Sequence, residues 1–553
     1  MLLYHHIMNF ERSFKKGVFI VFLLFIISCN NQANNNVNGD SYNPQSPVEE
    51  IAEGTPEAIL RVLQEKDSTS LFERDSIKTF YKARANKPVW SDTQFRNAFL
   101  DTLKNAKYQG FLFEDFHGNE IENLTKNLQD RSSEEISALD IYLTDAFFKY
   151  GKQLWYGKTN PKKLHEIWDL TRKKISISKL LNESIDKNDL SFAIKKLGPI
   201  NPIYNKLILA AKEQSILMEK DSSKFMKIEI GKTIKPENSD PRMPIIKARL
   251  QQLGYLKDAD TSSVNSKTSE KAIKAFQQDH GLMIDGIIGN ATLYNLNKSA
   301  KDWYNILQVN LERWRWYPRE LGSDYILVNV ADFKLEFIKN GKFKDEHKIV
   351  VGLPSRETPV FSDEIENIVL NPSWYIPPTI KIKDVIPGAR KDPNYINKKH
   401  LNVISQSGER LDPLNVNWNS KEVYSYRFKQ DPGSANPLGQ VKINFPNKHL
   451  IYLHDTNSKS LFSNNARSNS SGCVRVEGVI DLAKELLSDQ KQYNSDKVDE
   501  LLASGKTRYI KLTTPVKIYI FYWTAWRENG KTHFTHDIYN DDEKILKALN
   551  TIH

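Results

Sequence analysis

The sequence predicts a multi-domain α+β protein with a helical N-terminal domain, a small unit of three helices and a mainly β C-terminal domain. Apolar residues recur at three- and four-residue steps from about residue 56 to 220. Glycines then punctuate a short helical unit, and after residue 302 the apolar pattern alternates as in strands. A chain of 553 residues is long enough for several such domains.

The first residues have the pattern of an export signal. Arg12, Lys15 and Lys16 precede an apolar run over residues 18–27, and Ser28 and Cys29 follow the run. This run is too short to cross a bilayer as a mature helix, whereas its flanks are typical of secretory signals. Residues 26–29 also resemble the lipobox of bacterial lipoproteins, which implies a signal peptide over 1–28 and lipidation of Cys29. The alternative is a short N-terminal anchor with an incidental cysteine.

A flexible tether and a helical domain are expected next. Residues 30–46 are asparagine-rich and nearly free of apolar side chains, so a flexible tether is expected over residues 29–55. Residues 56–235 are expected to form a helical scaffold domain without a catalytic constellation, and its tryptophans are expected in the core. The clearest amphipathic stripe consists of Leu139, Leu143, Phe147, Tyr150 and Leu154.

Residues 240–299 form the predicted three-helix unit. Each expected helix carries an apolar face, namely Ile246, Leu250 and Leu253, then Ile273 and Phe276, then Leu293 and Leu296. The strings LQQLGYL, AIKAFQQDHGL and DGIIGNAT occur in order and resemble the peptidoglycan-binding domain of many cell-wall enzymes. The resemblance implies wall binding, although such units also serve as spacers.

The third domain, residues 302–553, is expected to be mainly β. Ile326, Val328 and Val330 alternate, Asn340-Gly341 is a hairpin signal, and residues 516–523 predict a buried strand. Residues 375–436 are polar and turn-rich, so they predict an insertion that caps the site.

Composition narrows the possible partners. The net charge of +10 comes from 78 basic and 68 acidic residues that are mixed along the chain, without an arginine-rich block or zinc-finger spacing. We therefore expect no nucleic-acid partner, and a protein suited to anionic envelope polymers or membrane surfaces. No metal and no organic cofactor is implied.

One of the two cysteines, Cys473, lies in the turn SNSSGCVRVEG. A thiol attacks carbonyls as the thiolate, which requires a nearby base and donors for the oxyanion. His454 precedes it by nineteen residues in LIYLHDTNSK, where alternation places Tyr452 and His454 on one strand face. Gly472 lets the backbone approach a substrate closely.

These residues resemble the signature of L,D-transpeptidases with a YkuD-type catalytic domain. The shared elements are HDT, residues 454–456, and SSGCVR, residues 470–475. The resemblance extends over roughly residues 302–545 through NPSWYIPPTI, PLGQVKINFPN and YWTAWRENGKTHF. The order of parts resembles the large multi-domain subclass of these enzymes.

The resemblance implies roles for matching residues. Cys473 would be the nucleophile and His454 the general base, and the amides of Gly472 and Cys473 would form the oxyanion hole. Arg475 would support the turn or a substrate carboxylate. Many relatives carry histidine at the position of Ser471, so a base-orienting role for this side chain is in doubt. The residues expected to line the pocket are Tyr452, Asp455, Trp374 and Ser470.

The implied reaction is acyl transfer between peptidoglycan stem peptides. The donor tetrapeptide loses its terminal D-alanine to form a thioester, and an amine acceptor completes a 3→3 crosslink; water would give L,D-carboxypeptidase activity. The expected protein is a monomeric, lipid-anchored, periplasm-facing protein of the bacterial envelope, sensitive to carbapenems. The alternatives are a cysteine endopeptidase or amidase, a wall-binding structural lipoprotein, and a metallopeptidase. For the metallopeptidase, His533 and His536 lie three residues apart and His449 lies near His454. However, His449 and His454 would face opposite sides of one strand and could not share a metal.

Overall fold

The structure is a computed structural model that describes residues 53–65, 71–170, 172–220, 227–392 and 394–551. These residues belong to one compact unit, Ile51–His553. The expected signal peptide, Cys29 and nearly all of the expected tether lie outside the described residues.

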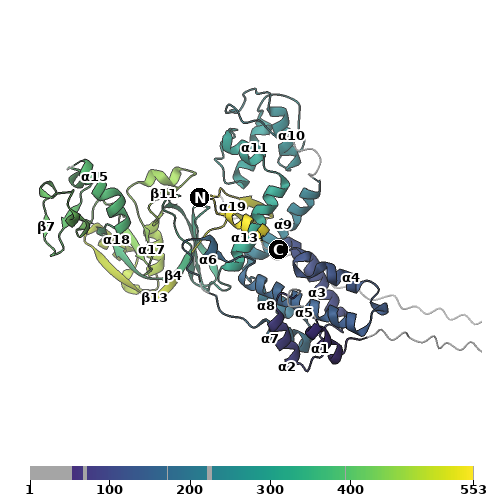
Figure 1. The fold of residues 1–553 in the computed structure, drawn as a ribbon. Coiled ribbons are helices and arrows are strands. Elements are labelled where there is room, and N and C mark those ends of the chain that lie inside the picture. Colours follow the sequence, from purple (N-terminus) through teal and green to yellow (C-terminus); the bar gives the residue numbers. More distant parts are fainter. Residues whose placement is uncertain (1–52, 66–70, 171, 221–226, 393, 552–553) are drawn as a thin grey trace, which may run out of the picture. The chain divides into compact units, whose positions relative to one another are not determined.

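The region that ends at residue 220 is helical, as predicted (Figure 1). Its longest described helix, α5 (Ser133–Tyr156), begins at a capping box between Ser132 and Glu135, and the predicted stripe from Leu139 to Leu154 is buried along it. Trp90 lies in the core, and Trp155 and Trp168 pack against it. The other helices are α1 (Pro56–Glu65), α2 (Arg74–Ala83), α3 (Thr93–Asn105), α4 (Gly118–Thr125), α6 (Pro161–Leu164), α7 (Ile177–Lys187), α8 (Leu190–Leu197) and α9 (Pro202–Lys220).

The small helical unit has its own apolar core. Among the described residues it consists of α10 (Met243–Gln252), α11 (Lys267–Asp279) and α12 (Asn290–Leu296). The predicted apolar faces meet in this core, with Leu253 at its margin. The preceding segment also belongs to the unit, because Ile234 pairs with Ile288 and Ser239 with Val264.

The expectation of a strand pattern directly after residue 302 was wrong. Residues 300–316 form the helix α13 (Ala300–Trp316), capped by Ser299 and Asp302, and the first strand begins only at Tyr325. Trp303, Leu307, Leu311 and Trp314 follow each other at helical steps and are buried.

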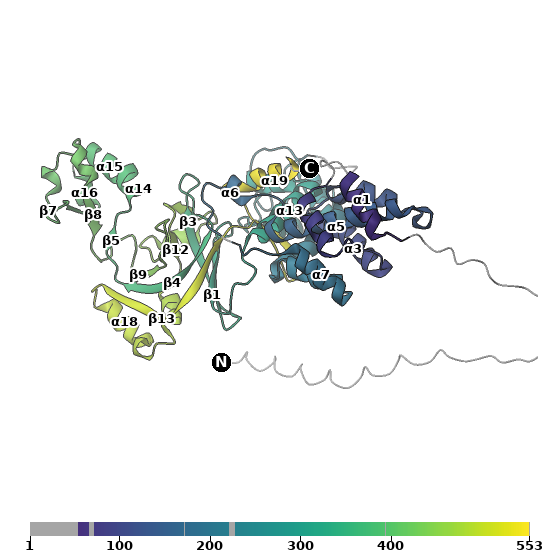
Figure 2. The same ribbon diagram turned by 60° about the horizontal axis from the view of Figure 1, so that its bottom comes forward.

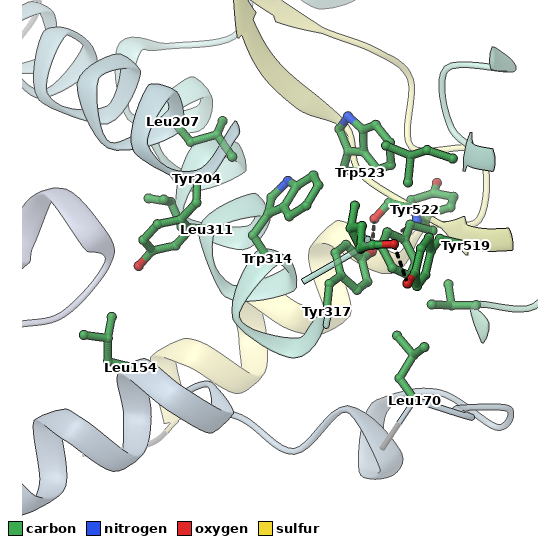
Figure 3. Close-up of a cluster of buried hydrophobic side chains, with 14 of the residues drawn as sticks. Leu154, Leu170, Tyr204, Leu207, Leu311, Trp314, Tyr317, Tyr519, Tyr522 and Trp523 are labelled. Atoms are coloured by element: carbon green, nitrogen blue, oxygen red, sulfur yellow. Dashed lines mark hydrogen bonds between the residues drawn. The ribbon is translucent and has the colours of Figure 1, made fainter. Parts of the chain in front are cut away.

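Helix α13 packs between the helical region and the β domain. Figure 3 shows Tyr204 and Leu207 of α9 on one side of Trp314, and Tyr522 and Trp523 on the other. The ring of Tyr317, which caps α13, stacks on Phe521 with centroids 4.0 Å apart, and its hydroxyl donates to the backbone oxygen of Tyr522 at 2.6 Å. These contacts fix the sheet to the helices.

The β domain is built on a large sheet that closes on itself. Its strand order is β11-β3-β12-β10-β9-β4-β13-β1-β2, and β2 also pairs with β3. The predicted hairpin is present, with Asn340 and Gly341 both at positive φ (53° and 69°). The strands are β1 (Tyr325–Asn329), β2 (Lys334–Lys339), β3 (Lys342–Gly352), β4 (Phe361–Leu370), β9 (Val441–Asn444), β10 (Leu453–His454), β11 (Ser468–Ser470), β12 (Val474–Val476) and β13 (Arg508–Phe521).

The predicted buried strand at residues 516–523 corresponds in part to the end of β13, which stops at Phe521; Ile518 to Phe521 are buried, whereas Lys517 is exposed. Strand β13 pairs with β4 and with β1, and is therefore interior to the sheet. The helix α17 (Val479–Leu487) buries its apolar face in the same core. The remaining elements of the domain are α18 (Ser495–Ala503), β14 (Ala525–Glu528), β15 (Lys531–Phe534) and α19 (Asp541–Thr551).

The insertion between β4 and β9 is a small folded lobe, which Figure 2 shows with α14, α15 and α16 beside β7 and β8. Its strands pair in the order β5-β8-β6-β7, and Val385, Val403 and Phe428 belong to a separate apolar core. Asn436 Nδ2 donates to the backbone oxygen of Pro372 at 3.0 Å, which ties the two ends of the lobe together. The elements are β5 (Trp374–Tyr375), α14 (Pro378–Ile380), α15 (Ile386–Lys391), α16 (Tyr395–Lys398), β6 (Asn402–Ile404), β7 (Arg410–Leu411) and β8 (Arg427–Gln430).

Candidate active site

Two neighbouring strands bring the predicted thiol and imidazole to one face of the sheet. Strands β10 and β12 are parallel, with Leu453 opposite Val474 and His454 opposite Arg475. Leu453 and Val474 point into the apolar core. Because side chains alternate along a strand, Tyr452 and His454 share the other face with Cys473 and Arg475.

Cys473 is a free, partly buried thiol. Its Sγ donates to the backbone oxygen of Leu450 at 3.6 Å, and the Tyr452 hydroxyl faces it. Burial raises the pKa of the Cys473 thiol, and this outweighs the opposite effects of Tyr452, Lys442 and Arg475. The group at rest is therefore a thiol, which needs a base before it attacks.

His454 is buried and held in one tautomer. Its Nδ1 donates to the backbone oxygen of Asp455 at 2.5 Å, which leaves Nε2 as the acceptor. Burial lowers the pKa of His454 to about 3, and the positive charge of Arg475 adds to the effect. The imidazole is therefore neutral at physiological pH and able to accept a proton.

Tyr452 lies beside the thiol, and Trp374 lies beside Tyr452. The Tyr452 ring meets that of His454 edge-on with centroids 5.5 Å apart. The Trp374 side chain hydrogen-bonds to the Tyr452 hydroxyl, and burial raises the pKa of Tyr452. Trp374 is the first residue of β5, the strand through which the chain enters the inserted lobe, so this end of the lobe reaches the site.

The turn before Cys473 differs in part from the expected oxyanion hole. Gly472 adopts φ +112°, a backbone conformation that favours glycine. Its amide donates to Ser470 Oγ at 3.1 Å, and Ser470 Oγ donates to the backbone oxygen of Cys473 at 2.6 Å. The Gly472 amide is thus engaged, whereas the Cys473 amide has no acceptor among the described residues and is the available donor.

Ser471 points to a residue that the sequence reasoning missed. Arg356 Nη1 donates to Ser471 Oγ at 2.9 Å and also binds Asp384 of the inserted lobe, at 2.7 and 2.8 Å through its two terminal nitrogens. The backbone oxygen of Asp455, and not Ser471, orients the imidazole. Thr358 Oγ1 supports the same turn by donating to the backbone oxygen of Gly472 at 2.8 Å.

The Asp455 side chain does not line the pocket as expected. It follows His454 along the chain, so it points to the opposite side. Its Oδ2 accepts the amide of Gln440 at 2.9 Å, and its Oδ1 pairs with Lys459. The carboxylate therefore holds the turn at Gly439, whose φ is +58°.

Lys442 is a second missed residue on the same face. It lies opposite His454 in the pairing of β9 with β10, and its Nζ stands 4.0 Å from the centre of the Tyr452 ring. Alternation in PLGQVKINFPN was the available signal, since Val441 and Ile443 point into the core. The site thus combines a thiol, a neutral imidazole and two cations, Lys442 and Arg475.

Two of the histidines weighed for a metal site, His449 and His533, are each paired with a single carboxylate. His449 Nε2 lies 3.1 Å from Asp169, and His533 Nδ1 lies 3.4 Å from Asp279. Within the described ranges, no group of three or more His, Cys, Asp and Glu side chains is arranged to hold a metal ion.

None of the described helices combines the length and hydropathy of a membrane span.

Three segments of the chain match models of known protein families. Residues 75–210 match a scaffold domain, residues 239–296 a putative peptidoglycan-binding domain, and residues 323–518 the L,D-transpeptidase catalytic domain (YkuD). A putative L,D-transpeptidase of Haemophilus influenzae is 35% identical over 243 residues, which cover 44% of this chain and 49% of that protein. The chain thus spans about half the length of this curated relative.

Solved structures of L,D-transpeptidases also align with the chain. The enzyme of Stackebrandtia nassauensis is 14% identical with a TM-score of 0.21, and the alignment covers 54% of this chain and all of that one. A cysteine-to-serine mutant of the Enterococcus faecium enzyme is 11% identical with a TM-score of 0.18, covering 56% of this chain and 100% of its own.

Proposed function

We propose that this chain, whose residues 323–518 match the L,D-transpeptidase catalytic domain (YkuD) behind matches to scaffold and peptidoglycan-binding domains, crosslinks peptidoglycan by acyl transfer through Cys473. The observation that carries the proposal is the shared face of Cys473 and His454, with the imidazole neutral and its Nε2 available. A thiol beside a neutral, oriented base is the arrangement that nucleophilic catalysis requires.

In the first half-reaction the Cys473 thiol proton moves to His454 Nε2 while Sγ attacks the donor. The target is the carbonyl carbon between the diamino acid and the terminal D-alanine of a tetrapeptide stem. The Cys473 amide stabilises the oxyanion, since it has no acceptor among the described residues. The C–N bond then breaks, D-alanine takes the proton from His454, and a thioester remains on Cys473.

In the second half-reaction the side-chain amine of another stem attacks the thioester. His454 accepts the proton of the amine, the C–S bond breaks, and the sulfur leaves as thiolate or recovers the proton. The product is a 3→3 crosslink. Water in place of the amine gives a tripeptide, so exclusion of water decides between transpeptidase and carboxypeptidase activity.

The inserted lobe, about residues 375–436, is proposed to cap the site. Its first strand supplies Trp374, and Asp384 reaches the catalytic turn through Arg356 and Ser471. Contacts from one lobe at two points of the site support a role in holding the donor and excluding water.

The remaining parts fit a location in the bacterial cell envelope. The domain over residues 239–296 is proposed to bind peptidoglycan, and lipidation of Cys29 would retain the monomeric protein at a membrane facing the wall. No cofactor enters the proposed reaction. Carbapenems are proposed to acylate Cys473, because a strained β-lactam presents the same acyl carbon to the thiol.

The experiment follows the products made from a disaccharide-tetrapeptide. The full chain is expected to release D-alanine and form a 3→3 dimer, whereas Cys473→Ser forms neither. Tripeptide without dimer would assign the protein to L,D-carboxypeptidase activity. Loss of existing crosslinks would assign it to endopeptidase or amidase activity, and wall binding without turnover would favour a structural lipoprotein.

A further inference from the structure

The alternation of side chains along β9 determines which face of the sheet Lys442 lies on. Its neighbours Val441 and Ile443 are fully buried in the core of the sheet. Lys442 therefore points to the opposite face, where the register places it across from His454. Its side chain is partly buried beside the proposed nucleophile.

The ammonium group is held there without being neutralised. Nζ stands 4.0 Å from the centre of the Tyr452 ring, which attracts a cation through its π face. Within the described part of the chain, no carboxylate acts on the Lys442 ammonium. Burial lowers the pKa of the Lys442 ammonium, and Cys473 as thiolate is the anion that opposes this effect.

The charged groups around Cys473 come from three adjacent strands. Lys442 lies on β9, Tyr452 and His454 belong to the β10 segment, and Arg475 lies on β12. Of the two cations, Lys442 has the larger effect on the Cys473 thiol, and Arg475 has the larger effect on the His454 imidazole. The two cations thus have separable roles on one face.

We propose that the ammonium group of Lys442 stabilises the thiolate of Cys473 electrostatically. Lys442 is thus a positioning residue, and the Tyr452 ring holds its charge in place. A carboxylate partner would cancel the field at the sulfur, whereas an aromatic ring orients the ammonium and leaves its charge intact. When the thiol proton passes to His454 Nε2, the negative charge left on Sγ faces Lys442. This inference rests on the proposed function of Cys473 as nucleophile.

The test measures the thiol without any substrate. The full chain is alkylated with iodoacetamide across a range of pH, and mass spectrometry of the Cys473 peptide gives the rate at this residue alone. Lys442→Met is expected to raise the apparent pKa of Cys473 by about one, so that alkylation at pH 7 slows about tenfold. Lys442→Arg keeps the charge and is expected to restore most of the rate.

Lys517→Met is the matched control, because Lys517 lies on β13 and pairs with Glu364 at 2.9 Å, outside the site. Its alkylation profile should match that of the wild type. Equal shifts in Lys442→Met and Lys442→Arg would show a packing effect on Tyr452 and overturn the proposal.

A Lys442→Met profile identical to that of the wild type would also overturn it, and a raised KM for the tetrapeptide would then assign Lys442 to a substrate carboxylate. Failure of the proposed function is distinguishable, since it appears as absence of turnover in the wild type while the thiol pKa is still measured.

Discussion

The imidazole of His454 is oriented by the backbone of the next residue, since Nδ1 donates to the backbone oxygen of Asp455 at 2.5 Å. This backbone acceptor fixes the tautomer. The hydrogen bond and the charge of Asp455 both raise the pKa of the imidazole, but burial and the positive charge of Arg475 outweigh them. The base is thus correctly oriented by a group that no side-chain substitution at residue 455 removes.

The first prediction separates the side chain of Asp455 from that of His454. His454→Gln is expected to lower the rate of acylation by about 10²- to 10⁴-fold, because the base is lost. Asp455→Ala leaves the orienting carbonyl in place but removes the acceptor of the Gln440 amide, so it should cost about 1–3 kcal/mol of stability. Urea unfolding and single-turnover acylation measure the two effects. Equal loss of rate in both variants, at unchanged stability, would contradict this division.

The second prediction concerns the pH dependence of stability. Burial lowers the pKa of His454 to about 3 in the folded state, below its ordinary value in the unfolded chain. Between these two pKa values the unfolded state binds more protons, so stability is present at neutral pH and is lost as the pH falls toward about 3.

Between pH 7 and pH 4, the free energy of unfolding should therefore fall by about 1–3 kcal/mol more in the wild type than in His454→Gln. The comparison with the variant is needed because burial also lowers the pKa of His280 to about 3 and that of His165 to about 4. Urea unfolding at both pH values measures the difference, and parallel losses in the two proteins would contradict the buried neutral state of His454.

The third prediction tests the link between the inserted lobe and the catalytic turn. Arg356→Ala breaks the contacts with both Asp384 and Ser471, so acylation is expected to slow about tenfold as the turn loses its support. Asp384 acts through Arg356, so Asp384→Ala should have no further effect in the Arg356→Ala background.

Lys398→Ala serves as the control, because Lys398 pairs with Asp392 within the lobe and both are exposed at the surface. Additive effects of Arg356→Ala and Asp384→Ala, in a double-mutant cycle of acylation rates, would show that the lobe acts on the site by another route.

The fourth prediction is covalent inhibition by carbapenems. The Cys473 thiol is expected to open the β-lactam ring, and the protein should gain the full mass of the drug because ring opening releases no fragment. Peptide mapping places the adduct, and Cys473→Ser should remain unmodified. Adduct formation on Cys473→Ser, or none on the wild type, would contradict the assignment.

Local patterns were sufficient to predict the features that depend on periodicity. The stripe from Leu139 to Leu154 gave α5, and Asn340-Gly341 gave a hairpin turn with both φ angles positive. Alternation gave the common face of Tyr452 and His454. Helix α13 was missed even though Trp303, Leu307 and Leu311 are spaced as in a helix, because the tryptophans and the valine of this segment also suit a strand.

The polar contacts of the site could not be predicted, since they join loops distant in sequence. Arg356 meets Ser471 across 115 residues, and the Gly472 amide is taken by Ser470 through a local turn that no motif encodes. Asp455 was wrongly assigned to the pocket because it is adjacent to His454 in the sequence. Successive side chains on a strand point to opposite faces, so adjacency argues against a shared pocket.

The most direct test of the account is the mass of the protein after mixing with a tetrapeptide donor that lacks an acceptor amine. A thioester on Cys473, at the mass of the donor minus D-alanine, with none on Cys473→Ser and slow formation in His454→Gln, is the predicted result. Turnover of the donor by Cys473→Ser, or an acyl group on any other residue, would contradict the assignment of Cys473 as nucleophile.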